Sequence, residues 1–352
     1  MMFRKLSIAA IGSLIASLSF TPSAQATGDV WVEGSYEYLA LPDVRFVNQV
    51  RLNGTFTGSV IEEFRNDDGD FEGFRIDGGI ANIAIMGGAY VMDVKGFFAW
   101  HDDKSDLECA NNVVGFVGTA CYAVPLVDNP NIGEFVGNFF RGVNQFTTER
   151  DVDHWGVSLN VAQGPMGLKA GPAFRRIDQD ITITGREINS GTLPDAFQLT
   201  YSEDLETNYW GAFVGADGAI DLGGGWSLQG DAEAGLYWAD TEYKGNYQVV
   251  NARLAGGLNP NLSQQLSLES DELAFIGVLK AALEKDFGMF KLAGFGRVEY
   301  ISSAPDMAYN DQDLFTGGVF LQGPHDETRI GERYAFSVST GARITVPMGS
   351  GQ

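Results

Sequence analysis

The chain has 352 residues and a formal net charge of −23 at pH 7, with 46 acidic residues against 23 basic ones. Such acidity argues against nucleic acid as a partner, because basic surfaces bind the phosphate backbone. Glycine accounts for 45 residues without a three-residue period, which excludes collagen and is typical of β structure with many turns.

The N-terminal segment has the composition of a secretory signal peptide. Two basic residues precede an apolar run over 6–20, and "AQA" at 24–26 matches a small-x-small cleavage site. The run is short for a membrane-anchoring helix, and Pro22 ends it. We predict a cleaved signal peptide over 1–26 and one exported domain over 27–352.

Ten segments of the exported part alternate apolar and polar residues with a period of two. Each is about ten or more residues long, the length of a tilted strand that crosses a bilayer. Pro172 and the pair Arg175-Arg176 make one segment less regular than the others. The predicted strands cover about 29–40, 72–83, 89–100, 151–162, 168–182, 207–222, 226–241, 272–285, 289–301 and 332–347.

Short and long connections between these strands alternate strictly. The short ones lie near 85–88, 164–167, 223–225 and 286–288, and the long polar ones near 41–71, 101–150, 183–206, 242–271 and 302–331. A soluble periplasmic β-sandwich does not explain this alternation. Short periplasmic turns, long external loops and an even strand count are typical of outer-membrane barrels.

We therefore predict an all-β fold: a transmembrane antiparallel up-and-down barrel of about ten strands in the outer membrane of a Gram-negative bacterium. Twelve strands are the alternative, since "NVVGFVG" and "IGEFVGNFF" within 101–150 would form a further hairpin. The expected surroundings are outer-membrane lipid and lipopolysaccharide. The sequence does not specify an oligomeric state.

The two faces of each predicted strand differ in polarity. In 210–238 the face that carries Trp at both ends is apolar, so it is expected to meet lipid, with its Trp residues at the two interfaces. Charged residues lie on the opposite face, which leaves two interpretations: a water-filled pore, or a plug of ion pairs in a barrel too narrow to conduct. The candidate pore-lining residues are Glu33, Glu37, Arg75, Asp77, Asp93, Lys95, Asp217, Asp221, Asp231, Glu233, Lys280, Glu284, Lys291, Arg297, Glu299 and Arg343.

The two cysteines, Cys109 and Cys121, both fall in the longest predicted loop. A close pair in an exported protein is expected to form a disulfide bond. A metal or redox role is not indicated, because there is no C-x-x-C motif and no paired histidine ligand nearby.

The last predicted strand carries "STGARITV", which resembles the assembly signal of bacterial outer-membrane barrels. Ser339, Gly341, Ile344 and Val346 fill its polar, glycine and two apolar positions, although the usual terminal aromatic residue is missing. The resemblance implies that the barrel assembly machinery is a partner of this chain.

Three further stretches resemble the repeats of legionella-type major outer membrane proteins. They are "FEGFRIDGGI", "HWGVSLNVAQGPMGLKAGPAF" and "YWGAFVGADGAIDLGGGWSLQGDAEAGLYW". That family is regarded as pore-forming, so the resemblance implies a pore.

Enzymatic chemistry has weak support. His101 and His154, each flanked by aspartates, are predicted to meet at the outer mouth, and ten-stranded barrel proteases use Asp–His pairs at that rim. The facing Asp pair of such proteases is not recognisable here, so we expect no enzyme and a polar rim that can bind a divalent cation.

The acidic stretch 62–73 does not match a calcium-binding loop, because Phe64 and Arg75 occupy the positions of the first and last ligands. Motifs for nucleotide cofactors are absent, and no cofactor is expected.

The predicted function is passive diffusion of small hydrophilic solutes through a narrow lumen, with a mild cation preference that arises from acidic external segments. The alternative is a non-conducting surface, adhesin or structural protein of the outer membrane. A barrel hydrolase is the third possibility.

Overall fold

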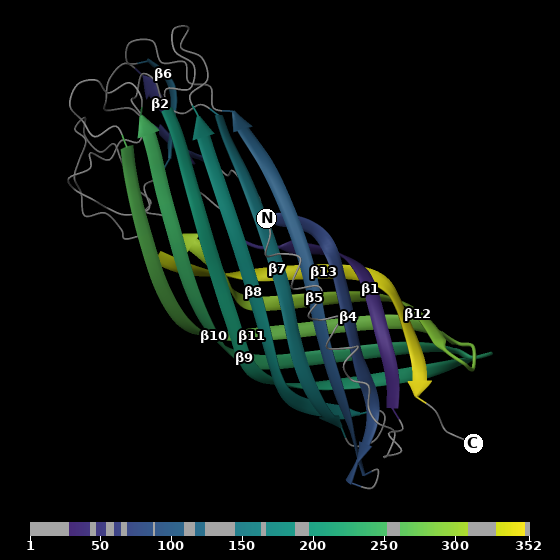
Figure 1. Cartoon of the computed structure of the whole chain (residues 1–352). Helices are drawn as coiled ribbons and strands as arrows, with labels where there is room; N and C mark the ends of the chain where they lie inside the picture. The colour runs from purple at the N-terminus through teal and green to yellow at the C-terminus, as the bar shows by residue number, and fades with distance from the viewer. Residues whose placement is uncertain are drawn as a thin grey trace.

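The structure, a computed structural model, describes residues 28–42, 47–53, 60–64, 69–86, 89–108, 117–123, 145–162, 167–186, 197–251, 261–308 and 329–348. Ten strands of this part form one closed antiparallel barrel, in the order β1-β13-β12-β11-β10-β9-β8-β7-β5-β4 (Figure 1). The prediction of a ten-stranded all-β barrel is therefore confirmed. The strands are β1 (Gly28–Ala40), β4 (Asp70–Ile85), β5 (Tyr90–Glu108), β7 (Gln145–Ala162), β8 (Leu168–Arg186), β9 (Phe197–Gly223), β10 (Trp226–Asn251), β11 (Asn261–Asp286), β12 (Lys291–Ala308) and β13 (Arg329–Met348).

Several predictions fall outside these residues. The signal peptide and Cys109 are not among them, and neither is the side chain of Cys121, so the cleavage site and the Cys109–Cys121 bond stay predictions. Within the described part of the chain, no helix is both long and apolar enough to cross a membrane.

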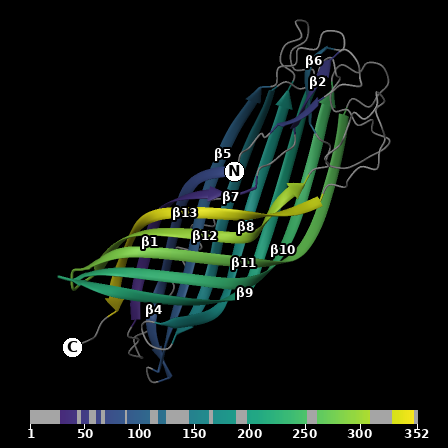
Figure 2. The same cartoon turned by 180° about the vertical axis from the view of Figure 1, so that it is seen from behind.

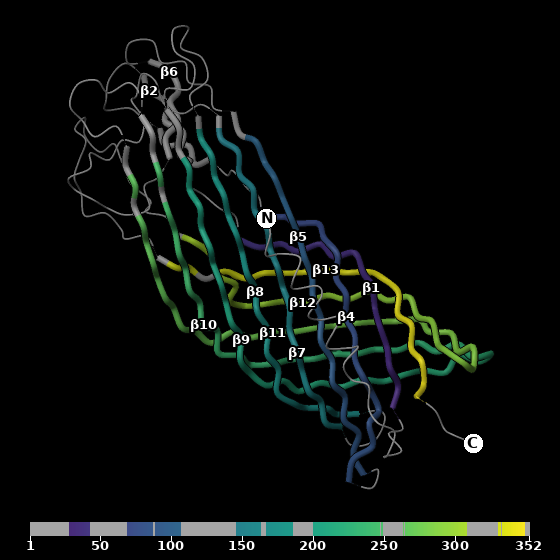
Figure 3. Tube along the Cα trace, viewed as in Figure 1, coloured from purple at the N-terminus to yellow at the C-terminus, as the bar shows by residue number. Residues whose placement is uncertain are grey.

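The first and last strands close the barrel. β1 and β13 pair in continuous antiparallel register, from Gly28 opposite Met348 to Ala40 opposite Phe336, and β1 pairs with β4 on its other side. Closure gives hydrogen-bond partners to backbone groups that an open edge would leave unpaired in hydrocarbon. The view from behind and the tube of the Cα trace show the strands running obliquely around the barrel (Figures 2 and 3).

Three short strands form a separate sheet. They are β2 (Val47–Asn53), β3 (Val60–Phe64) and β6 (Val117–Ala123), in the order β3-β2-β6. β6 belongs to the predicted loop 101–150, yet it pairs with β2 rather than with a barrel strand. The described part of that loop thus adds no strand to the ten-stranded barrel, while most of the two segments behind the twelve-strand alternative, 112–118 and 132–140, lies outside the described residues. Figures 1 and 2 place β2 and β6 near the ends of the long strands.

The tight connection between β9 and β10 follows from glycine. Gly224 and Gly225 form the turn with φ angles of 61° and 77°. Positive φ at both central residues is the requirement of a type I′ hairpin turn, which glycine meets without strain. Of the other predicted short turns, 286–288 includes Gly288 with a φ of 83°, while 87–88 and 163–166 lie outside the described residues.

The strands are longer than predicted at the end opposite these turns. β8, β9, β10 and β11 continue into the segments 183–206 and 242–271, which the sequence analysis assigned to loops. The alternation persists there, but its polarity is reversed. On β9, Trp210 and Val214 face outward and are exposed, whereas further along the same strand Glu206 faces outward, and Tyr201 and Leu205 face inward and are buried.

The outer wall carries an apolar belt bounded by aromatic rings. Trp226 and Trp238 stand at its two ends on β10, twelve residues apart. At about 3.4 Å per residue and a strand tilt of about 45°, this spacing spans about 29 Å, the height of a bilayer core. The belt contains exposed side chains from around the barrel, including Val32, Ile76, Val94, Val157, Val214, Ile220, Leu228, Leu236, Leu279, Leu283, Val298, Val338 and Ile344.

An aromatic girdle marks the upper edge of this belt. Neighbouring strands bring its rings into contact, with centroids 5.9 Å apart for Tyr36 and Phe74 and 4.2 Å apart for Phe174 and Trp210. Amphipathic rings at this height are typical of the membrane–water interface. The girdle comprises Tyr36, Phe74, Trp100, Trp155, Phe174, Trp210, Trp238, Tyr300 and Tyr334.

Above the girdle the outer wall becomes acidic. This acidic wall includes the segments "DDKSDLE" and "SEDLE", which the sequence analysis placed in external loops and which lie in β5 and β9. Several carboxylates stand directly opposite one another on neighbouring strands, such as Asp240 and Asp271. Its outward-facing acids are Asp102, Asp106, Glu149, Asp151, Asp153, Asp178, Asp180, Asp204, Glu206, Asp240, Glu242, Glu269 and Asp271.

The orientation of the barrel can be tested by labelling single cysteines on intact cells, in a background that lacks Cys109 and Cys121. We expect Asn246→Cys, on the extension of β10, to react with a membrane-impermeant maleimide. Phe287→Cys, in the β11–β12 turn, should react only after the outer membrane is permeabilised. The reverse pattern would contradict the orientation.

Like-charge repulsion above the girdle predicts a pH-dependent stability. Burial raises the pKa of the Asp204 carboxyl, and Asp180 directly opposite raises it further. Lys244 lowers this pKa, but its effect is smaller than that of Asp180. Because the folded pKa lies above the unfolded one, the repulsion costs stability at higher pH, and this cost disappears as the pH falls through the raised pKa.

Asp180→Asn should therefore raise the free energy of unfolding at pH 7 by a few tenths of a kcal/mol and flatten its rise toward acid pH, since directly opposed like charges on a sheet are destabilising by roughly 0.2–1 kcal/mol. Urea unfolding in detergent at several pH values measures this. Ser202→Ala, on the same face of β9, is the control. An unchanged or lower stability of Asp180→Asn would contradict the repulsion.

Candidate functional site: the barrel lumen

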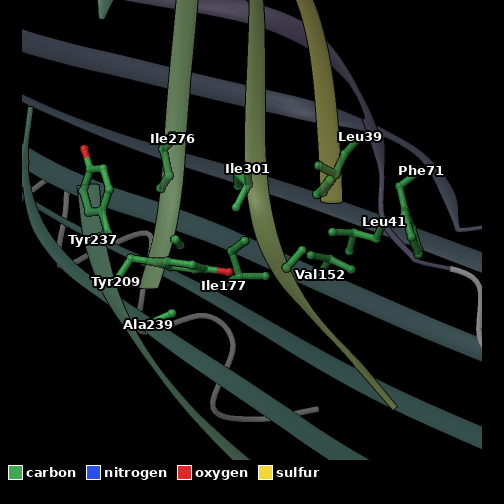
Figure 4. Packing of buried hydrophobic residues seen from close by; sticks show 13 residues of the cluster. Leu39, Leu41, Phe71, Val152, Ile177, Tyr209, Tyr237, Ala239, Ile276 and Ile301 are labelled. Carbon is green, nitrogen blue, oxygen red and sulfur yellow. The ribbon is translucent and has the colours of Figure 1, made fainter. Parts of the chain in front are cut away.

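The lumen holds three levels of side chains between the outer extensions and the periplasmic turns. The uppermost, here called the luminal apolar layer, is a cluster of buried residues on nine of the ten barrel strands (Figure 4). Phe71, Val152, Ile177 and Tyr209 in this layer each have 0 % exposed surface, so no water-sized path passes beside them. The full layer comprises Leu39, Leu41, Phe71, Val152, Ile177, Tyr209, Tyr237, Ala239, Ala274, Ile276, Ile301, Ala304 and Ala335.

Hydrogen bonds and a cation–π contact link barrel strands on the outer side of the luminal apolar layer. The Tyr209 hydroxyl donates to the Ser303 carbonyl at 2.9 Å, across the lumen from β9 to β12. The Arg150 guanidinium lies over the Phe71 ring at 4.8 Å and donates to the Gln179 side chain. Polar groups from opposite walls therefore meet above the apolar side chains and hold the layer in place.

A buried cluster of charges lies below the apolar layer, at the height of the aromatic girdle. This luminal ion cluster contains three acids and three bases: Glu37, Arg75, Asp77, Arg175, Arg297 and Glu299. Arg75 donates from Nε to Asp77 at 2.8 Å, and Arg297 binds both Asp77, at 3.0 Å, and Glu299, at 2.6 Å. The equal numbers of opposite charges allow their burial, which an unpaired ion would make very costly.

Two pairs of the cluster, Arg75 with Asp77 and Arg297 with Glu299, lie along one strand, and others cross the barrel. Arg175 on β8 binds Glu299 on β12, and Arg297 on β12 binds Asp77 on β4. The ring of Phe97 lies in the same level, 3.7 Å from the Arg75 guanidinium carbon. Side chains from opposite walls meet because ten strands enclose a lumen only slightly wider than one that side chains fill.

The third level is a cavity of about 320 Å³ at the end of the barrel that carries the short turns. Its rim residues Lys291 and Asp231 have side chains 38 % and 31 % exposed, so water reaches it from the periplasmic side. Ion pairs also run along its walls: Lys169 binds Asp231 at 2.7 Å and Glu233 at 2.9 Å, and Arg343 binds Glu284 at 2.9 Å.

The predicted pore-lining residues separate into these levels. Thirteen of them line the cavity, which follows from their positions on the inward face. Glu37 and Glu299 lie deeper, in the ion cluster, with 1 % exposure each. Asp221 is exposed beside the β9–β10 turn, where its Oδ1 accepts a hydrogen bond from the Gly223 amide at 2.8 Å. The cavity residues from the prediction are Glu33, Arg75, Asp77, Asp93, Lys95, Asp217, Asp231, Glu233, Lys280, Glu284, Lys291, Arg297 and Arg343.

Sequence reasoning missed several inward polar residues of β7 and β8. Lys169, Arg175 and Asn160 all line the cavity. The predicted irregularity at Pro172 obscured the alternation of β8. The β7–β8 pairing does skip from Ser158 opposite Ala173 to Val161 opposite Ala170, but the pairing of β8 with β9 is uninterrupted, so the inward face could have been read from its β9 partners.

The two histidines predicted to meet at the outer mouth lie buried in the lumen and face away from their neighbouring aspartates. Asp102 and Asp153 lie on the outer wall, because successive residues of a strand point to opposite faces. His101 Nε2 lies 3.7 Å from a Glu37 carboxylate oxygen, and His154 Nε2 lies 4.0 Å from one of Glu299. Both histidines are 2 % exposed. Among the described residues, no group of three or more His, Cys, Asp or Glu is placed to hold a metal ion.

No family model matches the chain, and no curated protein matches it either. Three solved structures with similar shapes have low sequence identity to this chain. The outer membrane protease OmpT from Escherichia coli is 8 % identical, over 94 % of this chain and 99 % of that one, with a TM-score of 0.39. The translocator domain of the autotransporter NalP from Neisseria meningitidis is 12 % identical, over 97 % and 96 % of the chains, with a TM-score of 0.37.

A Pseudomonas aeruginosa FadL homologue is 9 % identical, over 92 % of this chain and 91 % of that one, with a TM-score of 0.30. At TM-scores below 0.5, none of these likenesses bears on what this chain does. The closed barrel, the apolar belt and the aromatic girdle do establish its class: it is an outer-membrane β-barrel protein. No match supports the finer resemblance to legionella-type major outer membrane proteins, which stays a prediction.

Glu299→Gln should destabilise the barrel strongly, by about 3–5 kcal/mol, because it leaves the buried arginines of the ion cluster without their shared carboxylate. The measurement is urea unfolding, monitored on gels by the difference in mobility between the folded barrel and the heat-denatured chain. Adding Arg175→Gln restores the charge balance and should recover part of the loss. Asp221→Asn, outside the cluster, is the control. Equal stability of Glu299→Gln and the control would contradict the role of the cluster.

Proposed function

We propose that this protein is a closed, non-conducting outer-membrane barrel that holds its extracellular extensions in fixed positions as a binding or structural surface. The observation that carries the proposal is the packed cross-section of the lumen. Phe71, Ile177 and Tyr209 of the apolar layer have no exposed surface, and the ion cluster lies directly below them. A continuous aqueous path would require both levels to separate.

The extensions support the surface role. β10 continues for thirteen residues from Trp238 to Asn251, which corresponds to about 30 Å above the girdle at the same rise and tilt. Buried inward side chains such as Tyr201 and Tyr243 fill this part, and Tyr243 donates a hydrogen bond to Glu203 at 3.1 Å. A filled and hydrogen-bonded extension suits the presentation of surface segments to an external partner.

The second candidate is the predicted pore for small hydrophilic solutes, which the resemblance to legionella-type proteins also implies. The water-accessible charged cavity favours it, because this cavity already provides a polar path through the end of the lumen that carries the short turns. The acidic wall would then give the predicted mild cation preference, an effect that salt screens over about 10 Å at 0.1 M. This reading requires a state in which the ion cluster opens.

We further propose that the protein is not an enzyme. His101 and His154 lie within the packed lumen rather than on the rim, and their nearest carboxylates belong to the ion cluster. Lipopolysaccharide, which the girdle would contact from outside, and the barrel assembly machinery remain proposed partners.

Planar-bilayer recording distinguishes the closed barrel from the pore. We expect folded wild-type protein to give no conductance steps above background, and we expect steps from a variant that combines Tyr209→Ala with Arg75→Ala, which removes one large side chain from each blocking level. Trp210→Ala, which faces lipid on the same strand, is the control and should stay silent. Uniform steps from the wild type, with a cation-biased reversal potential, would overturn the proposal in favour of the pore.

A further inference from the structure

The periplasmic cavity is closed above and open below, so it is a blind chamber rather than a segment of a conduit. The ion cluster forms its roof, since Arg75, Arg175 and Arg297 all line it. Its volume of about 320 Å³ lies at the lower end of the range of small-ligand pockets. A ligand would enter from the periplasm and be held among the charged walls.

One side of the chamber is acidic. On β5, β9 and β10, Asp93, Asp217 and Asp231 line it near the rim. Asp217 stands directly opposite Asp231 across the β9–β10 pair, an arrangement of like charges that is unfavourable without a cation between or beside them. Lys169 binds Asp231 at 2.7 Å but leaves this side with an excess of carboxylate. Together with Glu233 the side carries four acids against the three bases Lys95, Lys169 and Arg175, a net charge of −1.

A buried amide adds to the acceptors of this side. Asn160 on β7 lines the chamber and is 2 % exposed, and its Oδ1 accepts no hydrogen bond among the described residues. It lies directly opposite Asp93 in the β5–β7 pairing. A buried acceptor without a donor is costly, so a donor from a ligand would be favoured here.

The side formed by β11, β12 and β13 is basic. Lys280, Lys291, Arg297 and Arg343 line it against Glu284, and the neighbouring β1 adds the acids Asp29 and Glu33, which leaves a net charge of +1. Arg343 binds Glu284 at 2.9 Å, but its buried Nε has no acceptor among the described residues. Lys291 at the rim lies 3.6 Å from Glu284, beyond hydrogen-bond length, and remains 38 % exposed. This side therefore has spare donors for an anionic group.

We propose that the chamber binds small zwitterionic solutes from the periplasm, with an ammonium group at Asp217, Asp231 and Asn160 and a carboxylate group at Lys291 and Arg343. A single ligand with both charges satisfies the acidic and the basic side at once. A bare divalent cation fits less well, because no group of acids within the described residues is placed to ligate a metal. A short peptide has the two charges at its ends and a size that the chamber accepts. The proposal does not depend on whether the lumen conducts.

Calorimetric titration of the folded full-length protein in detergent tests the proposal, with L-alanyl-L-alanine as the probe. Two singly charged analogues are the comparison: N-acetyl-L-alanine, which lacks the ammonium group, and L-alanine methylamide, which lacks the carboxylate. We expect saturable binding of the dipeptide and about tenfold weaker binding of each analogue, the effect of one charge-assisted hydrogen bond.

Two rim substitutions locate the binding. Asp217→Asn and Lys291→Gln should each weaken binding of the dipeptide by about tenfold for the same reason. Asp221→Asn, on the same strand but outside the chamber, should bind like the wild type. Heat-modifiable mobility shows that each variant is folded. No saturable binding of the dipeptide, equal binding of the three probes, or equal binding by all variants would each overturn the proposal.

Discussion

Closure of the ten-stranded hydrogen-bond circle is the constraint on which the rest of this structure depends. The pairing of β1 with β13 removes the two edges that hydrocarbon would not tolerate, and it also fixes the circumference of the wall. A ten-stranded circumference brings inward side chains from distant strands within reach of one another. Ion pairs such as Arg175 with Glu299 and Lys95 with Glu233 cross the lumen for this reason. A wider barrel with the same inward residues would leave them solvated along the wall.

The outer face of the wall contacts lipid between the aromatic rings and water above them, and this difference explains which parts of the fold could be predicted from the sequence. Between the aromatic rings the outward face is apolar, so the pattern identified all ten strands and their order along the chain. Above Trp210 and Trp238 the outward face meets water, and the same strands carry acids outside and apolar residues inside. The lipid-facing alternation therefore ends at the girdle, and the sequence pattern predicts loops where β9 and β10 extend. The small sheet of β2, β3 and β6 joins segments far apart in the chain, and no local pattern indicates such a pairing.

For the lumen, alternation correctly placed the charges of the regular strands on the inward face, but it did not indicate their partners. Whether an inward carboxylate lines water or a buried cluster depends on its height in the barrel and on the strand across the lumen, and neither is local information. Glu33 and Glu37 are four residues apart on β1, yet Glu33 lines the cavity and Glu37 lies in the ion cluster. The apolar layer was missed for a related reason. Its members, such as Ile177 and Ile301, lie where the inward face changes from polar to apolar, and an apolar residue gives no local sign that it faces the lumen rather than lipid.

The resulting lumen is asymmetric along its axis, and this asymmetry supports the proposed closed barrel over the pore. On the outer side, apolar packing and buried ion pairs reinforce each other, because the apolar layer excludes water that would otherwise screen the pairs below it. On the periplasmic side, side chains such as Lys291 and Asp231 remain accessible to water. Opening the lumen would hydrate Glu299 and its arginine partners together, since one carboxylate is shared by several of them. The blocking levels therefore behave as a cooperative unit. A barrel built in this way combines a packed outer lumen with a water-accessible chamber at the end that carries the short turns.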